Sequence, residues 1–192
     1  MEVRKLTDQT VIKNIYKTYM QDDFPQDELT PWIYIEDMLQ LDQYECYALY
    51  EDEDLYGYAF FLKKRVDGKL YYLFDYLAVT EAKRNHGCGT EFLRLLQDCF
   101  PDADCILGEV EDPDYGKDDD EKELRLRRIG FYLRNGYYAT DVKVCVRGVH
   151  YSILEIPTGP SHTKEEVKKI YEEIYKGIAP DWFMKKHFRI LE

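Results

Sequence analysis

Two glycines, Gly87 and Gly89, stand one residue apart in the stretch "KRNHGCGTEF". They follow the apolar run "LYYLFDYLAV" at 70–79 and precede "TEFLRLLQDCF", whose apolar residues recur at helical spacing. Glycines in a strand-to-helix turn permit positive φ and let a ligand approach the backbone closely. The free N–H groups at a helix N-terminus bind phosphate. The turn therefore predicts a binding site for a ligand that carries phosphate.

The spacing of these glycines excludes two common phosphate-binding loops. A P-loop requires a Lys followed by Ser or Thr directly after its last glycine, and no such pair follows here. A dinucleotide-binding turn requires a third glycine at the position that Phe92 occupies. The pattern that remains is Arg84-x-x-Gly87-x-Gly89, in which Arg84 and His86 add positive potential.

Two carboxylates stand in segments that are otherwise apolar. Asp75 interrupts the run at 70–79, and Glu109 lies near the end of "DCILGEV" at 104–110. A carboxylate in a buried strand is costly unless it is paired or used. Either group could act as a general base, directly or through water. A structural hydrogen bond or ion pair is the alternative for each.

The elements that must position these residues follow the order β-α-α-β-β-β-α-β-α-β-β-α. Strands are predicted at 1–6, 44–51, 55–64, 70–79 and 104–110, with two more inside 137–157. Helices are predicted at 8–23, 31–41, 90–100 and 121–135, and from Thr163 onward. The Asp-Gly pair in "VDGK" at 66–69 predicts a hairpin between two of the strands.

The turn "RNHGCG" fits the signature [Q/R]-x-x-G-x-[G/A] of the GNAT superfamily of acyl-CoA-dependent N-acyltransferases, which this sequence resembles. "DYLAVTEAKR" resembles the central strand of that family, and "RRIGFYLRNGY" at 127–137 resembles its second motif, F-Y-x-x-x-G-[FY]. The resemblance covers about residues 1–157. It implies an α/β (α+β) fold, with a single GNAT-like domain built on a mixed central sheet of about seven strands flanked by helices.

The resemblance also implies a co-substrate, acetyl-CoA, and no metal. Backbone N–H groups of the turn would cradle the pyrophosphate, aided by the helix dipole. The backbone of the central strand would bind the pantetheine arm. The residues implied in binding are Leu77, Ala78, Val79, Arg84, Asn85, His86, Gly87, Cys88, Gly89 and Thr90.

Tyr132 matches the family's general acid, which protonates the departing thiolate. Glu109 is slightly preferred to Asp75 as the base, although Gly108 makes the match to the family imperfect. The implied activity is an N-acetyltransferase in which a primary amine attacks the thioester directly within a ternary complex. The alternative is a non-catalytic acyl-CoA-binding or regulatory module.

Two arginines of the second motif admit two interpretations. Arg127 and Arg128 could contact the 3′-phosphate of the coenzyme, or they could balance the acidic segment "EVEDPDYGKDDDEKE" at 109–123. The second interpretation is preferred, because a run of carboxylates usually forms a solvated segment with charged partners nearby.

Composition limits the partners. The 192 residues are 45% hydrophobic and carry a net charge of −12, so a nucleic acid is not expected as a ligand. The acidic charge would suit a cationic acceptor, a small molecule or a peptide amine, or it serves solubility alone. No apolar run is long enough to span a membrane, and the first ten residues do not resemble a signal peptide. The five cysteines form no C-x-x-C pair, which argues against a disulfide scaffold or a zinc site and for the cytoplasm.

Residues 158–192 form an extension beyond the predicted domain at 1–157. Thr163 and Glu166 have the spacing of a capping box, which marks the start of a helix. An apolar stripe at helical spacing follows, formed by Val167, Ile170, Tyr171, Ile174, Tyr175 and Ile178. The stripe is expected to dock on the domain or on a second subunit of a homodimer. The alternative is a lid over the acceptor site.

Overall fold

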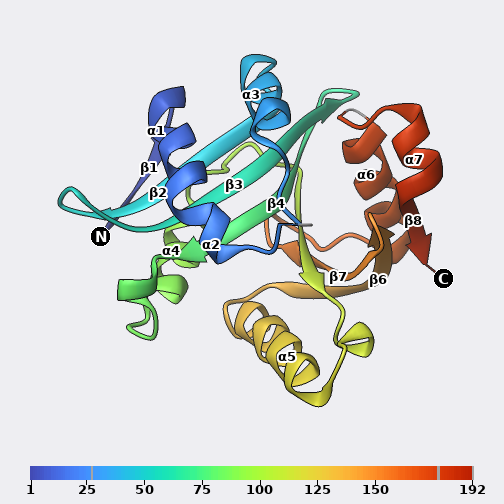
Figure 1. Cartoon of the computed structure of the whole chain (residues 1–192). Coiled ribbons are helices and arrows are strands. Elements are labelled where there is room, and N and C mark those ends of the chain that lie inside the picture. The colour runs from blue at the N-terminus through green and yellow to red at the C-terminus, as the bar shows by residue number, and fades with distance from the viewer. Residues whose placement is uncertain (27, 177, 192) are drawn as a thin grey trace. The chain divides into compact units, whose positions relative to one another are not determined.

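The computed structural model describes residues 1–26, 28–176 and 178–191. It is a mixed α/β fold with an eight-stranded sheet in the order β1-β2-β3-β4-β5-β7-β6-β8, flanked by helices (Figure 1). The chain forms two compact units. The first contains Met1–Lys63 and Phe74–Pro101, and the second contains Lys64–Leu73 and Asp102–Glu192.

The first unit holds the first strands of the sheet. Its strands are β1 (Glu2–Leu6), β2 (Tyr44–Glu51), most of β3 (Asp54–Val66) and the second part of β4 (Lys69–Val79). β1 pairs with β2, and β2 pairs with β3, each antiparallel. Its helices are α1 (Gln9–Ile15), the π-helical turn Tyr16–Met20, α2 (Gln21–Asp23), α3 (Trp32–Gln40) and α4 (Cys88–Gln97).

Aromatic rings fill the core of the first unit. Phe61 stacks on Phe74 with ring centroids 4.4 Å apart, and the ring of Phe100 lies 4.6 Å from that of Phe61. α4 buries Phe92, Leu93 and Leu96, as the helical spacing predicts. The turn at the start of α4 is therefore anchored by a buried helix face. Away from this core, the indole N–H of Trp32 donates to Glu36 at 3.0 Å.

The helix predicted at 8–23 is interrupted by a π-helical turn. α1 ends at Ile15, the π-helical stretch runs from Tyr16 to Met20, and α2 follows directly. A π-turn places residue i+5 above residue i. Ile15 and Met20 stand in that relation, and both are buried. The wider turn thus brings Met20 onto the apolar face, which a regular helix would not do.

The second unit holds the remaining strands, together with the first part of β4. These are β5 (Cys105–Glu111), β6 (Tyr138–Val146), β7 (Val149–Ile156) and β8 (Phe188–Leu191). The Asp104 N–H donates to the Leu70 carbonyl at 2.8 Å, so β4 and β5 start side by side and run parallel. The pairs β5–β7, β6–β7 and β6–β8 are antiparallel. The helices are α5 (Asp119–Arg134), α6 (Lys164–Lys176) and α7 (Asp181–His187).

The strand count differs from the predicted seven because of β8. This strand pairs with β6 over four positions, from Lys143↔Leu191 to Val146↔Phe188. Neither β8 nor α7, which precedes it, is predicted from the sequence. β8 has only 4 residues, so its local pattern is too short to indicate a strand. Pairing with β6 holds β8 in an extended conformation. A pattern read from a few neighbouring residues cannot show pairing with a strand that is distant in the sequence.

α6 buries five residues of the predicted apolar stripe inside the second unit, while the sixth, Ile178, lies beyond the end of α6 and is half-buried. Val167, Ile170, Tyr171, Ile174 and Tyr175 are buried, and α6 packs beside β6 and α7 (Figure 1). The rings of Tyr171 and Tyr175 also lie 5.5 and 5.0 Å from the ring of Phe188 on β8. By contrast, Trp182 on α7 is 63% exposed. The division of the chain at residue 157 stays a prediction.

Candidate functional site

The glycine turn lies where the sequence places it, between the end of β4 and the start of α4. β4 ends at Val79 and α4 begins at Cys88. Gly87 occupies the position before the helix with φ of 78°, in the left-handed region. A Cβ atom there would meet nothing within 4 Å, so this backbone conformation, and not packing, accounts for the glycine.

The N-terminus of α4 is open to an anion. The first N–H groups of an α-helix have no acceptor within the helix. The residue before α4 is a glycine, so no side-chain oxygen caps these groups. The first bond of the helix is the one from the Glu91 N–H to the Gly87 carbonyl, at 3.1 Å. The N–H groups of residues 88–90 are therefore suited to hydrogen-bond a phosphate.

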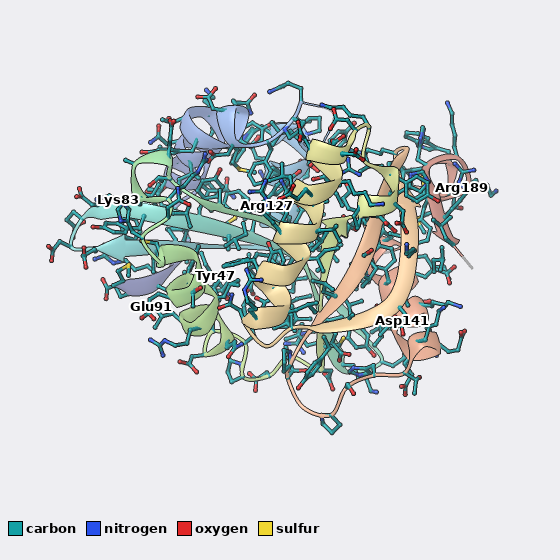
Figure 2. All side chains as sticks on the ribbon, turned by 90° about the horizontal axis from the view of Figure 1, so that it is seen from below. Tyr47, Lys83, Glu91, Arg127, Asp141 and Arg189 are labelled. Atoms are coloured by element: carbon teal, nitrogen blue, oxygen red, sulfur yellow. The ribbon has the colours of Figure 1, made fainter. Side chains whose placement is uncertain are left out.

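Side chains around the turn leave its backbone accessible. Asn85, His86 and Thr90 are exposed, whereas Cys88 is buried and could offer only its N–H group. Two charged residues lie beside these positions, Lys83 and Glu91 (Figure 2). The Lys83 amine lies 4.0 Å from the centre of the Tyr56 ring, and Glu91 forms an ion pair of 2.8 Å with an arginine on its own helix.

Arg84 ties the turn to the strand before it. Its Nε donates to the Val79 carbonyl at 3.0 Å, which joins the predicted strand segment 77–79 to the predicted turn. Its guanidinium also forms an ion pair with Asp23. The second oxygen of Asp23 accepts a hydrogen bond from Tyr58 at 2.7 Å. The charge of Arg84 is thus partly balanced within the protein by Asp23, and Tyr58 supports Asp23; sequence reasoning singled out neither residue.

Asp75 has a structural partner in the first unit. It lies on β4 and is partly buried, and its carboxylate accepts a hydrogen bond from the Tyr44 hydroxyl. The pKa of Tyr44 is raised well above its ordinary value, first by burial and then by the charge of Asp75. Tyr44 therefore stays protonated and donates to Asp75. This contact accounts for a carboxylate in an apolar strand.

Tyr76, the next residue of β4, holds Glu28 and Thr30, which lie between α2 and α3. Its hydroxyl donates to the Glu28 carbonyl and accepts from the Thr30 N–H, each at 2.9 Å. The ring also packs against Phe24 at 4.9 Å. The segment between α2 and α3 is therefore attached to the same strand that leads into the glycine turn.

Glu109 lies in the second unit, on β5, and is held by the C-terminal helix. The hydroxyls of Tyr171 and Tyr175 on α6 both donate to its Oε1, the second at 2.8 Å. Burial raises the pKa of Glu109, while the two hydrogen bonds act in the opposite direction because they stabilise the carboxylate. The sequence could not show this contact, since Glu109 is 62 positions from Tyr171 and 66 from Tyr175.

Tyr132 lies on α5, also in the second unit. Its ring packs against Phe131 at 5.4 Å and Tyr137 at 5.2 Å. Burial raises the pKa of Tyr132 to about 12, so the phenol is protonated at neutral pH. A protonated phenol is the form that a general acid requires.

The two arginines of the second motif are paired within the second unit. Arg128 forms an ion pair with Glu111, and the Arg127 Nε lies 4.0 Å from the Glu123 Oε1. Lys143 on β6 likewise pairs with Asp112 and Asp114, at 2.8 Å each. These contacts agree with the interpretation in which the basic residues balance the acidic segment.

The structure thus groups the predicted residues by unit. The first unit brings the segment 77–79 and the turn 84–90 together and carries Asp75 on the same strand. The second unit carries Glu109 and Tyr132 on adjacent elements, with no hydrogen bond between them in the described part of the chain. No helix among the residues that the structure describes is long and apolar enough to cross a membrane.

Comparisons with solved structures identify the fold. A GNAT-family acetyltransferase from Bacteroides thetaiotaomicron matches with a TM-score of 0.69 at 19% identity, over 90% of this chain and 96% of that one. The ribosomal-protein-S18-alanine N-acetyltransferase of Escherichia coli matches with a TM-score of 0.57 at 14% identity, over 83% and 95% of the two chains.

An aminoglycoside 6′-N-acetyltransferase, solved in complex with coenzyme A, matches with a TM-score of 0.57 at 15% identity. The match covers 84% of this chain and 99% of that one. No family model matches the sequence, and no curated protein matches it significantly. These matches span most of both chains at low identity, and they show that the chain has the fold of the GNAT acetyltransferases.

Proposed function

We propose that this protein transfers an acetyl group from acetyl-CoA to a primary amine. The observation that carries the proposal is the uncapped N-terminus of α4 behind the left-handed Gly87, joined to β4 through Arg84. Such a terminus presents N–H groups and a positive dipole to an anion. The shared fold supports it, because proteins with that fold include ones whose names state N-acetylation.

The proposed reaction is a direct transfer. The nitrogen of the neutral amine attacks the thioester carbon, the C–S bond breaks, and an amide forms. Tyr132 gives its proton to the departing thiolate, since its raised pKa keeps the phenol protonated. Glu109 or Asp75 accepts the proton lost by the amine, directly or through water, and releases it to solvent, and solvent returns a proton to the Tyr132 phenolate. We place Glu109 first, because a raised pKa brings a carboxylate nearer to the range of a useful base.

The proposed acceptor is a small molecule or a peptide with a primary amine. The names of the matched proteins cover both kinds, a ribosomal-protein alanine and an aminoglycoside. The net charge of −12 favours a cationic acceptor. The loop fixed by Tyr76, between α2 and α3, is our candidate for acceptor specificity.

One observation favours the alternative of a non-catalytic acyl-CoA-binding module. Glu109 already accepts two tyrosine hydrogen bonds, which makes it a less available base. One measurement distinguishes the two functions. An enzyme releases free coenzyme A when it is incubated with acetyl-CoA and a panel of amines, whereas a binding module retains acetyl-CoA unchanged.

Calorimetry with a Gly89→Val variant tests the coenzyme site. A branched side chain at this position of the turn obstructs an anion that approaches the backbone, so we expect acetyl-CoA affinity to fall at least about tenfold, a change of about 1.4 kcal/mol. Gly159→Val is the matched control, because a Cβ at Gly159 meets nothing within 4 Å. Unchanged affinity in a folded Gly89→Val protein would remove the turn from the proposal.

A further inference from the structure

Three side chains of types that bind metals converge in the second unit. Cys105 begins β5, Glu155 lies near the end of β7, and His162 lies in the segment before α6. Their potential ligand atoms all lie within 4.8 Å of one another. The His162 Nδ1 is 2.6 Å from the Glu155 Oε1, and the Cys105 Sγ is 4.0 Å from the same oxygen. Cys105 thus meets Glu155, which is 50 positions away in the sequence, and His162, which follows soon after Glu155.

The sheet register explains how two of these residues meet. β5 and β7 pair antiparallel, with Leu107 opposite Glu155 and Ile106 opposite Ile156. Cys105 and Leu107 therefore share a face with Glu155, because side chains alternate along a strand. His162 then reaches this face from the following segment, where its backbone N–H also donates to Glu155 at 3.1 Å.

Burial distinguishes this cluster from ordinary surface acids. Cys105 is 0% exposed and Glu155 is 3% exposed, while the His162 side chain retains 20% exposure. A buried carboxylate is unfavourable unless a positive charge balances it. A divalent cation would balance this carboxylate, and the partly exposed imidazole leaves the cation a route from solvent.

We propose that Cys105, Glu155 and His162 form a site for a divalent zinc-like cation. Zinc takes thiolate, imidazole and carboxylate ligands, and three protein ligands leave one position for water. Bonds of about 2.0–2.3 Å in a tetrahedral site separate ligand atoms by roughly 3.3–3.8 Å. To reach these values, the Nδ1–Oε1 distance must increase from 2.6 Å and the Sγ–Oε1 distance must decrease from 4.0 Å. Each change is less than about 1 Å. The placement of His162 outside the helices and strands permits that adjustment.

The site would act as a staple on the C-terminal segment. The residues between β7 and α6 carry His162, so the cation would join the start of α6 to β5 and β7. It is separate from Glu109, because Cys105 and Glu109 are four positions apart on one strand, roughly 13 Å at about 3.3 Å per residue. Sequence spacing could not reveal it, since its ligands come from three segments and form no C-x-x-C pair.

The test uses Co²⁺ as the probe on the full chain after treatment with a chelator. We expect one Co²⁺ per chain, with a thiolate-to-cobalt charge-transfer band and the intense visible bands of tetrahedral coordination. Zn²⁺ should displace the cobalt and raise the melting temperature, because a ligand that binds only the folded state stabilises it. Binding should weaken as the pH falls, since protons compete for the thiolate and imidazole.

Variants decide whether the three residues are the ligands. Cys105→Ser should abolish the charge-transfer band, and His162→Gln should weaken Zn²⁺ binding at least about a hundredfold, the upper end of the effect of losing a second-shell partner. Cys99→Ser is the matched control, because Cys99 lies in the first unit and its thiol donates to the Leu95 carbonyl.

His162→Gln covers the case in which Cys105→Ser fails to fold, since His162 lies outside the helices and strands. A chain that gives no cobalt–thiolate band would overturn the proposal. A band that survives in folded His162→Gln at full affinity would do the same. The cluster would then be a hydrogen-bonded His–Glu pair beside a buried thiol.

Discussion

At the scale of single residues, the site depends on groups whose protonation is set by burial. Tyr132 is held in its acid form by burial against aromatic rings. Burial also raises the pKa of Glu109, and two tyrosine hydroxyls partly offset that effect. The Asp75 carboxylate accepts a hydrogen bond from Tyr44. These environments differ enough that each residue gives a separate experimental signature.

Tyr132→Phe removes one hydroxyl and leaves the ring. The packing against Phe131 and Tyr137 should persist, so we expect acetyl-CoA binding to be unchanged. The turnover rate should fall about a hundredfold, the lower end of the usual range for general acid–base assistance, because a thiolate is already a fair leaving group. Stopped assays of coenzyme release under saturating substrate measure this. An unaltered rate where chemistry limits turnover would exclude Tyr132 as the acid.

Tyr171→Phe tests the protonation of Glu109 through the pH dependence of the rate. The mutation removes a hydrogen bond that lowers the pKa of Glu109, so that pKa should rise further. A base works only when ionised, and the acidic limb of the rate profile should therefore move to higher pH. Tyr138→Phe, on an exposed ring, is the control. A profile that keeps its position in Tyr171→Phe would show that Glu109 is not the base.

Glu109 should also leave a signature in stability. Its pKa in the folded protein is raised, so its contribution to folding is favourable below the unfolded pKa and is lost as the pH rises through the folded value. The wild-type chain should therefore lose stability relative to Glu109→Gln as the pH rises above about 4.5. Melting temperatures of both chains across that window measure the difference. Parallel curves would contradict the raised pKa.

At the scale of elements, α6 carries five buried apolar side chains of the C-terminal extension, whereas α7 and β8 carry none. Ile174→Ala should therefore lower the free energy of unfolding by about 2–5 kcal/mol, because it leaves a cavity beneath a fully buried side chain. Leu133→Ala, at an exposed position of α5, should change it by less than about 0.5 kcal/mol. Urea unfolding of the two variants gives the comparison. Equal effects would mean that the stripe does not contribute to the core.

The sequence predicts most elements but only part of the site, and the reason is the range of the interactions. The turn with Gly87 could be predicted, because a left-handed residue before a helix leaves a local pattern. The stripe of α6 could also be predicted from its spacing. The bonds from Tyr171 to Glu109 and from Tyr44 to Asp75 could not, since tertiary contacts create them. The strand β8 was missed for the same reason.

At the scale of the whole molecule, the extension serves both the core and the candidate base. Truncation after Pro160 removes α6, α7 and β8 together. It uncovers apolar side chains, leaves β6 without the partner on one edge, and removes both hydrogen-bond donors to Glu109. We expect a lower melting temperature or aggregation, with acetyl-CoA binding retained in the soluble fraction. A monomeric truncated protein of equal stability and altered acceptor preference would instead identify the extension as a lid.

The fluorescence of the two tryptophans can show whether the two units unfold together. Trp32 belongs to the first unit, beside Glu36, and Trp182 belongs to the second, on the exposed side of α7. Replacing either one by Phe leaves a single tryptophan, so the tryptophan emission of each variant, excited at a wavelength that tyrosine does not absorb, follows the melting of one half of the chain. Transitions that coincide would mean that both halves unfold in one all-or-none step. If the two transitions separate, each one gives the stability of one unit, without any added label.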